Sequence, residues 1–121
     1  MNRLWFTFLI FLITSPLWAA GTLCGNACKA TWNANTETDL AGYKMYLGVQ
    51  PSNYSIVKDV GKTLTPASPL VAISTLGLAD GQWYLAVTAY DVVGNEGGKS
   101  LEAPFLLDRQ APVGVGGVRV E

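Results

Sequence analysis

DGQWYLAVTAYDVVGNE, residues 80–96, is the stretch of sequence that decides the fold. Its eight central residues alternate between two sets, which are Trp83, Leu85, Val87 and Ala89, and Tyr84, Ala86, Thr88 and Tyr90. A period of two is typical of a β-strand, whose side chains point alternately to opposite faces of a sheet. Asp80-Gly81 before the strand and Gly94-Asn95 after it favour tight turns. The stretch therefore predicts a central strand bounded by a turn at each end.

Residues 1–20, MNRLWFTFLIFLITSPLWAA, have the pattern of a secretory signal peptide. A basic residue is followed by an apolar run, a Ser15-Pro16 break and small residues, so we expect cleavage after Ala20 or Gly21. A membrane anchor is the alternative, but the break leaves too short an apolar segment to span a bilayer. Leu23 directly precedes Cys24, which is the wrong spacing for a lipoprotein signal. We therefore expect an exported protein, periplasmic or extracellular, with no membrane insertion after cleavage.

The charge of the chain excludes some classes of partner. The sequence has 8 basic and 9 acidic residues, and removing the leader with Arg3 leaves 7 against 9, a net charge near −2. The basic residues are scattered, whereas nucleic acids and anionic membrane surfaces need a clustered positive patch. We expect neither as a partner.

Catalytic and metal-binding patterns are sparse. The absence of histidine excludes Ser-His-Asp and Cys-His arrangements. The carboxylates in or beside predicted turns are typical acceptors of backbone hydrogen bonds, and they are Asp39, Asp80, Asp91 and Glu96. Asp91, Asn95 and Glu96 supply too few oxygen ligands for calcium. The sequence thus predicts a non-enzymatic protein without a metal or other cofactor.

Cys24 and Cys28 are the two cysteines of the chain. In an exported protein a disulfide persists, and the three residues between them form a small ring that closes if the segment turns. Free or intermolecular thiols are the alternative. A zinc site is a poor further alternative, because two thiols without histidine cannot complete a four-ligand shell. We predict a Cys24–Cys28 disulfide.

Further alternating segments separated by turn residues predict five more strands, at residues 30–32, 40–47, 54–60, 70–76 and 99–107. Pro104 places its part of the last strand at an edge or a bulge, because proline lacks the N–H that a sheet requires. No segment after the leader has a helical period. This pattern predicts an all-β sandwich.

WNANTETDLAGYKMYLG (32–48), Asn53-Tyr54, Asp59-Val60-Gly61 and GLADGQWYLAVTAYDVVGNE (77–96) together resemble a fibronectin type III domain of bacterial and phage secreted proteins. The resemblance covers residues 30–107. It implies an immunoglobulin-like β-sandwich of antiparallel Greek-key sheets, with strand B at Trp32, C at Tyr43 and Met45, C′ at Tyr54, E at Val71 and Ile73, F at 83–91 and G at 99–107. Residues 21–29 form a short N-terminal segment with both cysteines.

Two positions depart from the family pattern. The family has a tyrosine near the start of strand F whose hydroxyl bonds nearby backbone, and here Trp83 stands there, followed by Tyr84. An indole donates but does not accept, so we expect this bond to be rearranged or lost. In addition, residues 21–29 are too short for strand A, which is apparently missing.

The C-terminal tail, DRQAPVGVGGVRVE (108–121), resembles a strand A at the wrong end of the chain. We hypothesise that it is donated to the next molecule by β-augmentation, with the valines as donated-strand residues, namely Val113, Val115, Val118 and Val120. Such a contact is heterologous and builds filaments. A loosely folded tail and the remnant of a second domain are the alternatives.

Tyr46, Tyr84 and Tyr90 are predicted to point outward from one sheet. Tyrosines there are suited to stacking on sugar rings or packing on a protein, although cross-strand aromatic pairs also stabilise a sheet without any ligand. The sequence thus predicts a non-catalytic exported fibronectin type III module for protein–protein interaction or extracellular structure. The alternative is a carbohydrate-binding module that uses the tyrosine face.

Overall fold

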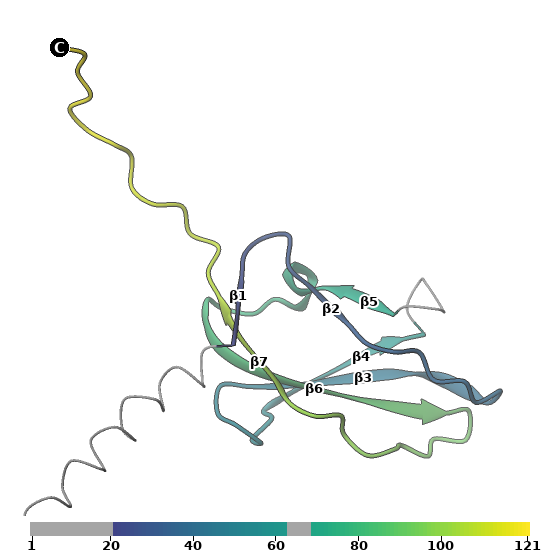
Figure 1. Cartoon of the computed structure of the whole chain (residues 1–121). Coiled ribbons are helices and arrows are strands. Elements are labelled where there is room, and N and C mark those ends of the chain that lie inside the picture. Colours follow the sequence, from purple (N-terminus) through teal and green to yellow (C-terminus); the bar gives the residue numbers. More distant parts are fainter. Residues whose placement is uncertain (1–20, 63–68) are drawn as a thin grey trace, which may run out of the picture.

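A computed structural model describes residues 21–62 and 69–121, and the structural statements below concern these residues (Figure 1). The predicted signal peptide lies outside them. The described chain forms seven strands and one short 3₁₀ helix, which are β1 Thr22–Cys24, β2 Lys29–Thr31, β3 Leu40–Gly48, β4 Ile56–Gly61, β5 Leu70–Ala72, η2 Ile73–Leu76, β6 Gly81–Asp91 and β7 Ala103–Leu107.

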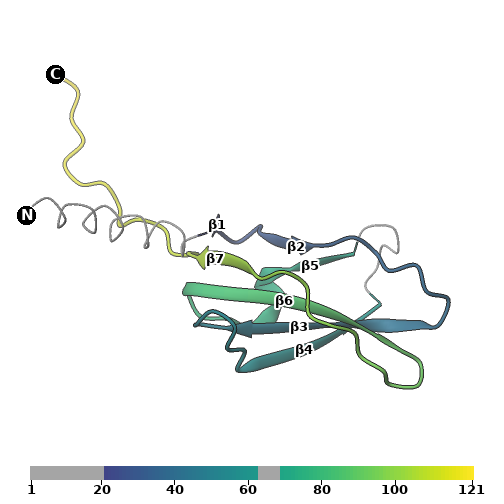
Figure 2. The same cartoon turned by 60° about the horizontal axis from the view of Figure 1, so that its bottom comes forward.

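The strands form two sheets, one in the order β1-β7-β6-β3-β4 and the other made of β2 and β5. The view in Figure 2 shows the two sheets as separate layers. The sheets bury a shared core, in which Met45 and Leu47 of β3 and Leu107 of β7 belong to the same apolar cluster as Ala30 of β2 and Ile73 after β5. The all-β prediction is confirmed, and the two-layer arrangement is consistent with a β-sandwich.

β6 is the central strand of the larger sheet, as its alternation predicts. It pairs with β3 on one side and β7 on the other, with Leu85 opposite Leu47 and Trp83 opposite Phe105. Trp83 and Leu85 belong to the core, and Val87 packs against it. The predicted turns are also present, since Gly81 and Gly94 have φ of 138° and 95°, which favour glycine.

The segment predicted as one strand from 70 to 76 is divided in two. β5 ends at Ala72, and residues 73–76 form η2, with Gly77 at φ 70° after it. Ile73 and Leu76 are both buried, because a spacing of three places them on the same side of a 3₁₀ turn. Val71 and Ile73 also fit the period of a strand, so the sequence pattern alone does not separate the two structures.

We expected strand A to be missing because residues 21–29 are too short for it. This segment does, however, contain a short strand. Residues 22–24 form β1, which pairs with β7 in parallel, with Thr22 opposite Phe105 and Cys24 opposite Leu107. Cys24 is 2% exposed, and its carbonyl accepts a hydrogen bond from Asp108 N at 2.8 Å. Burial of one side chain and pairing with β7 hold a strand that is too short to show a period.

The predicted disulfide is present between Cys24 and Cys28, whose Cα atoms are 5.3 Å apart. Cys24 ends β1 in the larger sheet, and Cys28 immediately precedes β2 in the smaller one. The bond therefore closes the turn at which the chain passes from one sheet to the other.

Trp83 makes a hydrogen bond to nearby backbone. Its indole Nε1 donates to the carbonyl oxygen of Ala79 at 2.8 Å. Pro104 lies inside the larger sheet, but β1 pairs only with residues 105–107, so Pro104 is just beyond the last residue paired on that side.

Candidate functional site

The three predicted face tyrosines do lie on one face of the larger sheet. Tyr46 is opposite Ala86, while Tyr84 and Tyr90 are opposite glycines of β3, so all three share the outer side. Tyr84, however, is only 7% exposed, so it lies on the predicted face but is covered there. Tyr84 lies opposite Gly48, at the end of β3. The turn that follows packs tightly against this glycine, since a Cβ on Gly48 would lie only 1.9 Å from the carbonyl oxygen of Asn53.

The accessible tyrosines of this face are bonded to carboxylates within the chain. Tyr46 donates to Glu96, and Tyr90 donates to Asp59 at 2.8 Å. Tyr54, which we did not predict as part of this face, packs edge-to-face on Tyr46 and donates to Glu102 at 2.7 Å. Burial, and then the bond to Glu102, raises the pKa of Tyr54 to about 12.

Glu96 connects the two central strands of this face. It accepts from Thr88 of β6 at 2.6 Å as well as from Tyr46 of β3, and Lys44 Nζ lies 3.6 Å away. The Thr88 hydroxyl, followed by that of Tyr46, lowers the pKa of Glu96, since both bonds favour the carboxylate. Because Tyr46 and Glu96 are 50 residues apart in the sequence, no local sequence pattern predicts their contact.

Lysines lie over the tyrosine rings. Lys99 Nζ is 4.5 Å from the ring centroid of Tyr46, and Lys44 Nζ is 5.4 Å from that of Tyr90. Hydroxyls and ring faces are thus both used within the chain, an arrangement that favours cross-strand stabilisation over stacking on a sugar.

Of the predicted turn carboxylates, Asp80 and Asp91 accept hydrogen bonds from backbone N–H groups. Asp91 accepts from Val93 N at 3.1 Å and from Asn95 N at 2.8 Å, whereas Glu96 bonds Thr88 instead.

Within residues 21–62 and 69–121, no group of three or more metal-binding side chains comes together. A helix long and apolar enough to cross a membrane is likewise not found in the described part of the chain.

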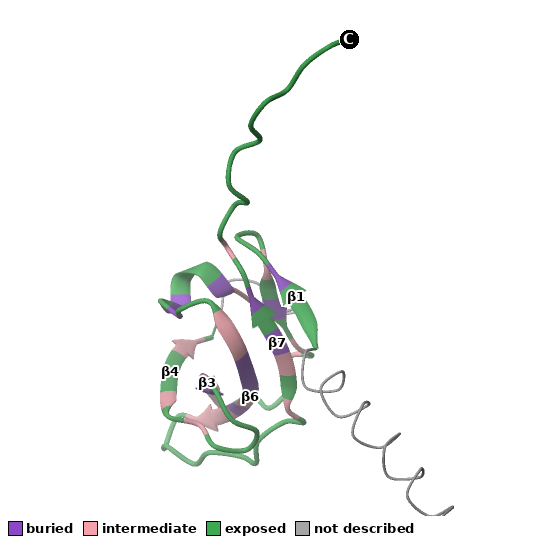
Figure 3. Ribbon diagram, turned by 90° about the vertical axis from the view of Figure 1, so that its left-hand side faces the viewer, coloured by how far each residue is buried: buried purple, intermediate pink, exposed green. Residues whose placement is uncertain are grey.

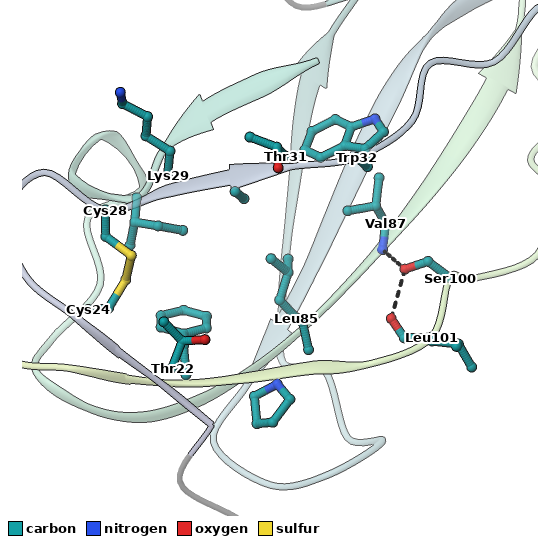
Figure 4. Close-up of a pocket in the computed structure, with 15 residues that line it drawn as sticks. Thr22, Cys24, Cys28, Lys29, Thr31, Trp32, Leu85, Val87, Ser100 and Leu101 are labelled. Carbon is teal, nitrogen blue, oxygen red and sulfur yellow. Dashed lines mark hydrogen bonds between the residues drawn. A yellow bond between two sulfur atoms is a disulfide. The ribbon is translucent and has the colours of Figure 1, made fainter. Parts of the chain in front are cut away.

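An apolar groove opens on the side of the sandwich between β2 and β7 (Figure 4). Its volume is about 510 Å³. Leu85 and Val87 of β6 form the floor with Phe105 of β7, and the disulfide lies at one end. Leu101, on the rim, is 95% exposed. We name this cleft the β2 groove; sequence reasoning did not predict it.

The edge of β2 that faces the groove has no strand beside it among the described residues. On the other side of β2, Ile73 N donates to Cys28 O at 2.9 Å and Trp32 N donates to Pro69 O at 3.4 Å. Successive residues of an antiparallel strand alternate the direction of their N–H and C=O groups. Lys29 and Thr31 therefore direct theirs away from β5, toward the groove.

The β2 groove continues along the chain after β2. A second hollow of about 710 Å³ shares Thr31, Trp32, Val87 and Ser100 with it and extends to Asn35 and Gly97. Together the two hollows follow the β2 side of the sandwich over residues 29–35, a length of about 20 Å at ~3.3 Å per residue. This is the length of an ordinary strand.

The tail leaves the sandwich as an extended segment beyond β7 (Figure 1). Its four predicted donor valines are 78–98% exposed, and Figure 3 shows the segment as exposed beyond Arg109, which is half-buried. Arg109 fixes its start, because its backbone N and its Nε bond to the carboxylate of Asp80 and its Nη2 donates to Leu78 O at 2.6 Å. The structure thus brings neither the tail nor the tyrosine face to the groove of the same molecule.

Comparison with known proteins adds no relative. No family model, no curated protein and no solved structure matches the chain.

Proposed function

We propose that this chain is a non-catalytic, exported module of the fibronectin type III kind that binds proteins by accepting an extended segment along the β2 groove. The single observation that carries the proposal is an edge of β2 that no described strand pairs with, beside an apolar floor. Backbone groups on such an edge bind an added strand, and pockets below it select alternate side chains.

The strand arrangement supports the family part of the proposal. The segments that the resemblance names B and E correspond to β2 and β5, which pair with each other. Those named C, C′, F and G correspond to β3, β4, β6 and β7, which form the other sheet together with β1. This division of strands is the one expected of an immunoglobulin-like sandwich. The Trp83 bond to Ala79 further supports it, since it stands where the family has its tyrosine.

The polarity of the groove supports a polypeptide ligand. Its wall is mostly apolar, and Lys29 is its charged residue, so an extended segment with alternating apolar side chains matches both the floor and the backbone edge. Carbohydrate binding by the tyrosine face is the weaker candidate, because Tyr84 is buried and the hydroxyls of Tyr46 and Tyr90 are already bonded to carboxylates.

Selection from a random twelve-residue peptide library tests the proposal. The target is the chain from Gly21 with Val118→Asp and Val120→Asp, so that its own exposed valines do not compete. We expect the selected peptides to alternate apolar and polar residues. We further expect amide exchange at Lys29 and Thr31 to slow at least tenfold when a synthetic copy of a selected peptide is added.

Thr31→Pro is the informative variant, and Thr31→Ala is its matched control. Proline removes the N–H that faces the groove and leaves the bonds to β5 in place, whereas alanine keeps the N–H. Peptides should lose at least tenfold in affinity for the proline variant and keep it for the alanine variant. Equal binding to both variants, or no selected peptide at all, would contradict the proposal.

A further inference from the structure

We infer that the segment filling the β2 groove is the C-terminal tail of a second copy of this chain. The inference rests on the proposed function, that the groove accepts a strand, and adds the identity of that strand. Three conditions must hold. The tail must match the groove in polarity, and it must be directed away from its own domain. One register must also satisfy both the apolar contacts and the backbone hydrogen bonds.

The tail matches the groove in polarity. Val118 and Val120 alternate with Arg119 and Glu121, so a strand formed by these residues has one apolar and one charged side. Both valines are at least 78% exposed in the single chain, and burying two such side chains is favourable by roughly 25 cal/mol per Å² of apolar surface. The floor of the groove, Leu85 and Val87, offers the apolar surface against which to bury them.

The start of the tail is directed away from its own groove. Asp108 N is bonded to Cys24 O, and Arg109 is held by Asp80 and Leu78 O, so the chain continues outward from the disulfide end of the sandwich (Figures 1 and 3). To pair antiparallel with its own β2, the tail would have to reverse direction twice within residues 110–117. A second copy placed head to tail receives the same segment without any reversal.

One register satisfies both strands. With Val120 opposite Ala30, an antiparallel strand has Val118 opposite Trp32, and both valines face the floor together with the buried Ala30. Arg119 and Glu121 then direct their backbone groups to the free groups of Thr31 and Lys29. Glu121 also comes directly opposite Lys29, and opposite charges at such a position stabilise a sheet.

The direction of pairing sets the form of the assembly. β2 runs opposite to β7, as Figure 1 shows, so a strand antiparallel to β2 runs the same way as β7 of the acceptor. Each donor therefore stacks behind its acceptor along one axis. The surfaces in contact differ, and the arrangement does not close, so the product is a head-to-tail filament.

Sedimentation velocity on two complementary variants tests the inference. Both variants are chains from Gly21: one carries Thr31→Pro and keeps its tail, and the other carries Val118→Asp and Val120→Asp and keeps its groove. The aspartates lie in the exposed tail, so that variant folds whatever the fate of the proline variant. The unaltered chain should form a concentration-dependent series of oligomers, and each variant alone should remain a monomer. Their equimolar mixture should contain a species of twice the monomer mass and nothing larger.

Two controls make the result specific. Gln110→Asp with Ala111→Asp adds the same number of charges to the part of the tail that lies before the groove, and it should weaken assembly far less than the 118/120 pair. Thr31→Ala should assemble as the unaltered chain does. The inference is overturned if the unaltered chain is monomeric at all concentrations, or if the mixed variants do not associate. If selected peptides bind the groove while the tail does not, the proposed function stands and this inference alone fails.

Discussion

Trp83 and Trp32 differ in what their indole N–H groups contact. Trp83 Nε1 donates to Ala79 O, whereas Trp32 Nε1 is buried and has no hydrogen-bond partner among the described residues. Trp83→Phe leaves the Ala79 carbonyl without its donor, while Trp32→Phe removes a donor that is already unsatisfied. We therefore expect Trp83→Phe to lower the free energy of unfolding by about 1–3 kcal/mol more than Trp32→Phe, measured by urea denaturation. Equal losses would show that the indole bond contributes nothing to stability.

Tyr54 makes stability depend on alkaline pH. Its pKa is raised from 10.0 to about 12 in the folded chain, so between these values the unfolded chain loses a proton that the folded chain retains. This contribution to stability is complete below pH 10 and is lost as the pH rises toward 12. The decline in the free energy of unfolding over this interval should be less steep in Tyr54→Phe. An unchanged pH profile in that variant would contradict the assignment.

At the scale of the element, the disulfide holds β1. The ring of residues 24–28 is small, and the loop-closure entropy of five residues corresponds to about 2 kcal/mol. Cys24→Ala with Cys28→Ala should lower the free energy of unfolding by roughly that amount, and amide exchange should accelerate more in β1 than in β6. A reducing agent should reproduce the loss in the unaltered chain and have no effect on the double variant. Equal exchange of β1 in both chains would mean that pairing with β7 alone holds the strand.

The long strands are predictable from their period, whereas the three-residue strand β1 is not. β6 and β3 have enough residues to show the alternation of a strand. The same alternation predicts that Tyr46 and Tyr84 lie on one face of the sheet, as they do. β1 has only three residues, so no period exists to detect. The burial of Tyr84 and the carboxylate partners of the other tyrosines depend on residues distant in sequence. The β2 groove was unpredictable for another reason: it results from a strand edge left without a neighbour, which only the sheet order reveals.

At the scale of the whole molecule, an assembly that forms only between folded copies links stability to concentration. Binding to the folded state alone raises the apparent stability with the concentration of the ligand, which here is the protein itself. The Tm of the chain from Gly21 should therefore rise with protein concentration. The Val118→Asp, Val120→Asp variant should have a constant Tm in the same scanning calorimetry series. A constant Tm in both chains would contradict assembly through the tail.

The parallel pairing of β1 with β7 also determines how the domain bears tension. Force applied at Gly21 and Gln110 pulls the start of one strand against the end of the other, so it acts along the strands, across their shared hydrogen bonds, and loads these bonds together in shear. Once that short pairing gives way, the covalent ring of Cys24 and Cys28 prevents residues 25–27 from extending. The load then passes to β2 and hence to the smaller sheet, so the smaller sheet determines how far the domain stretches.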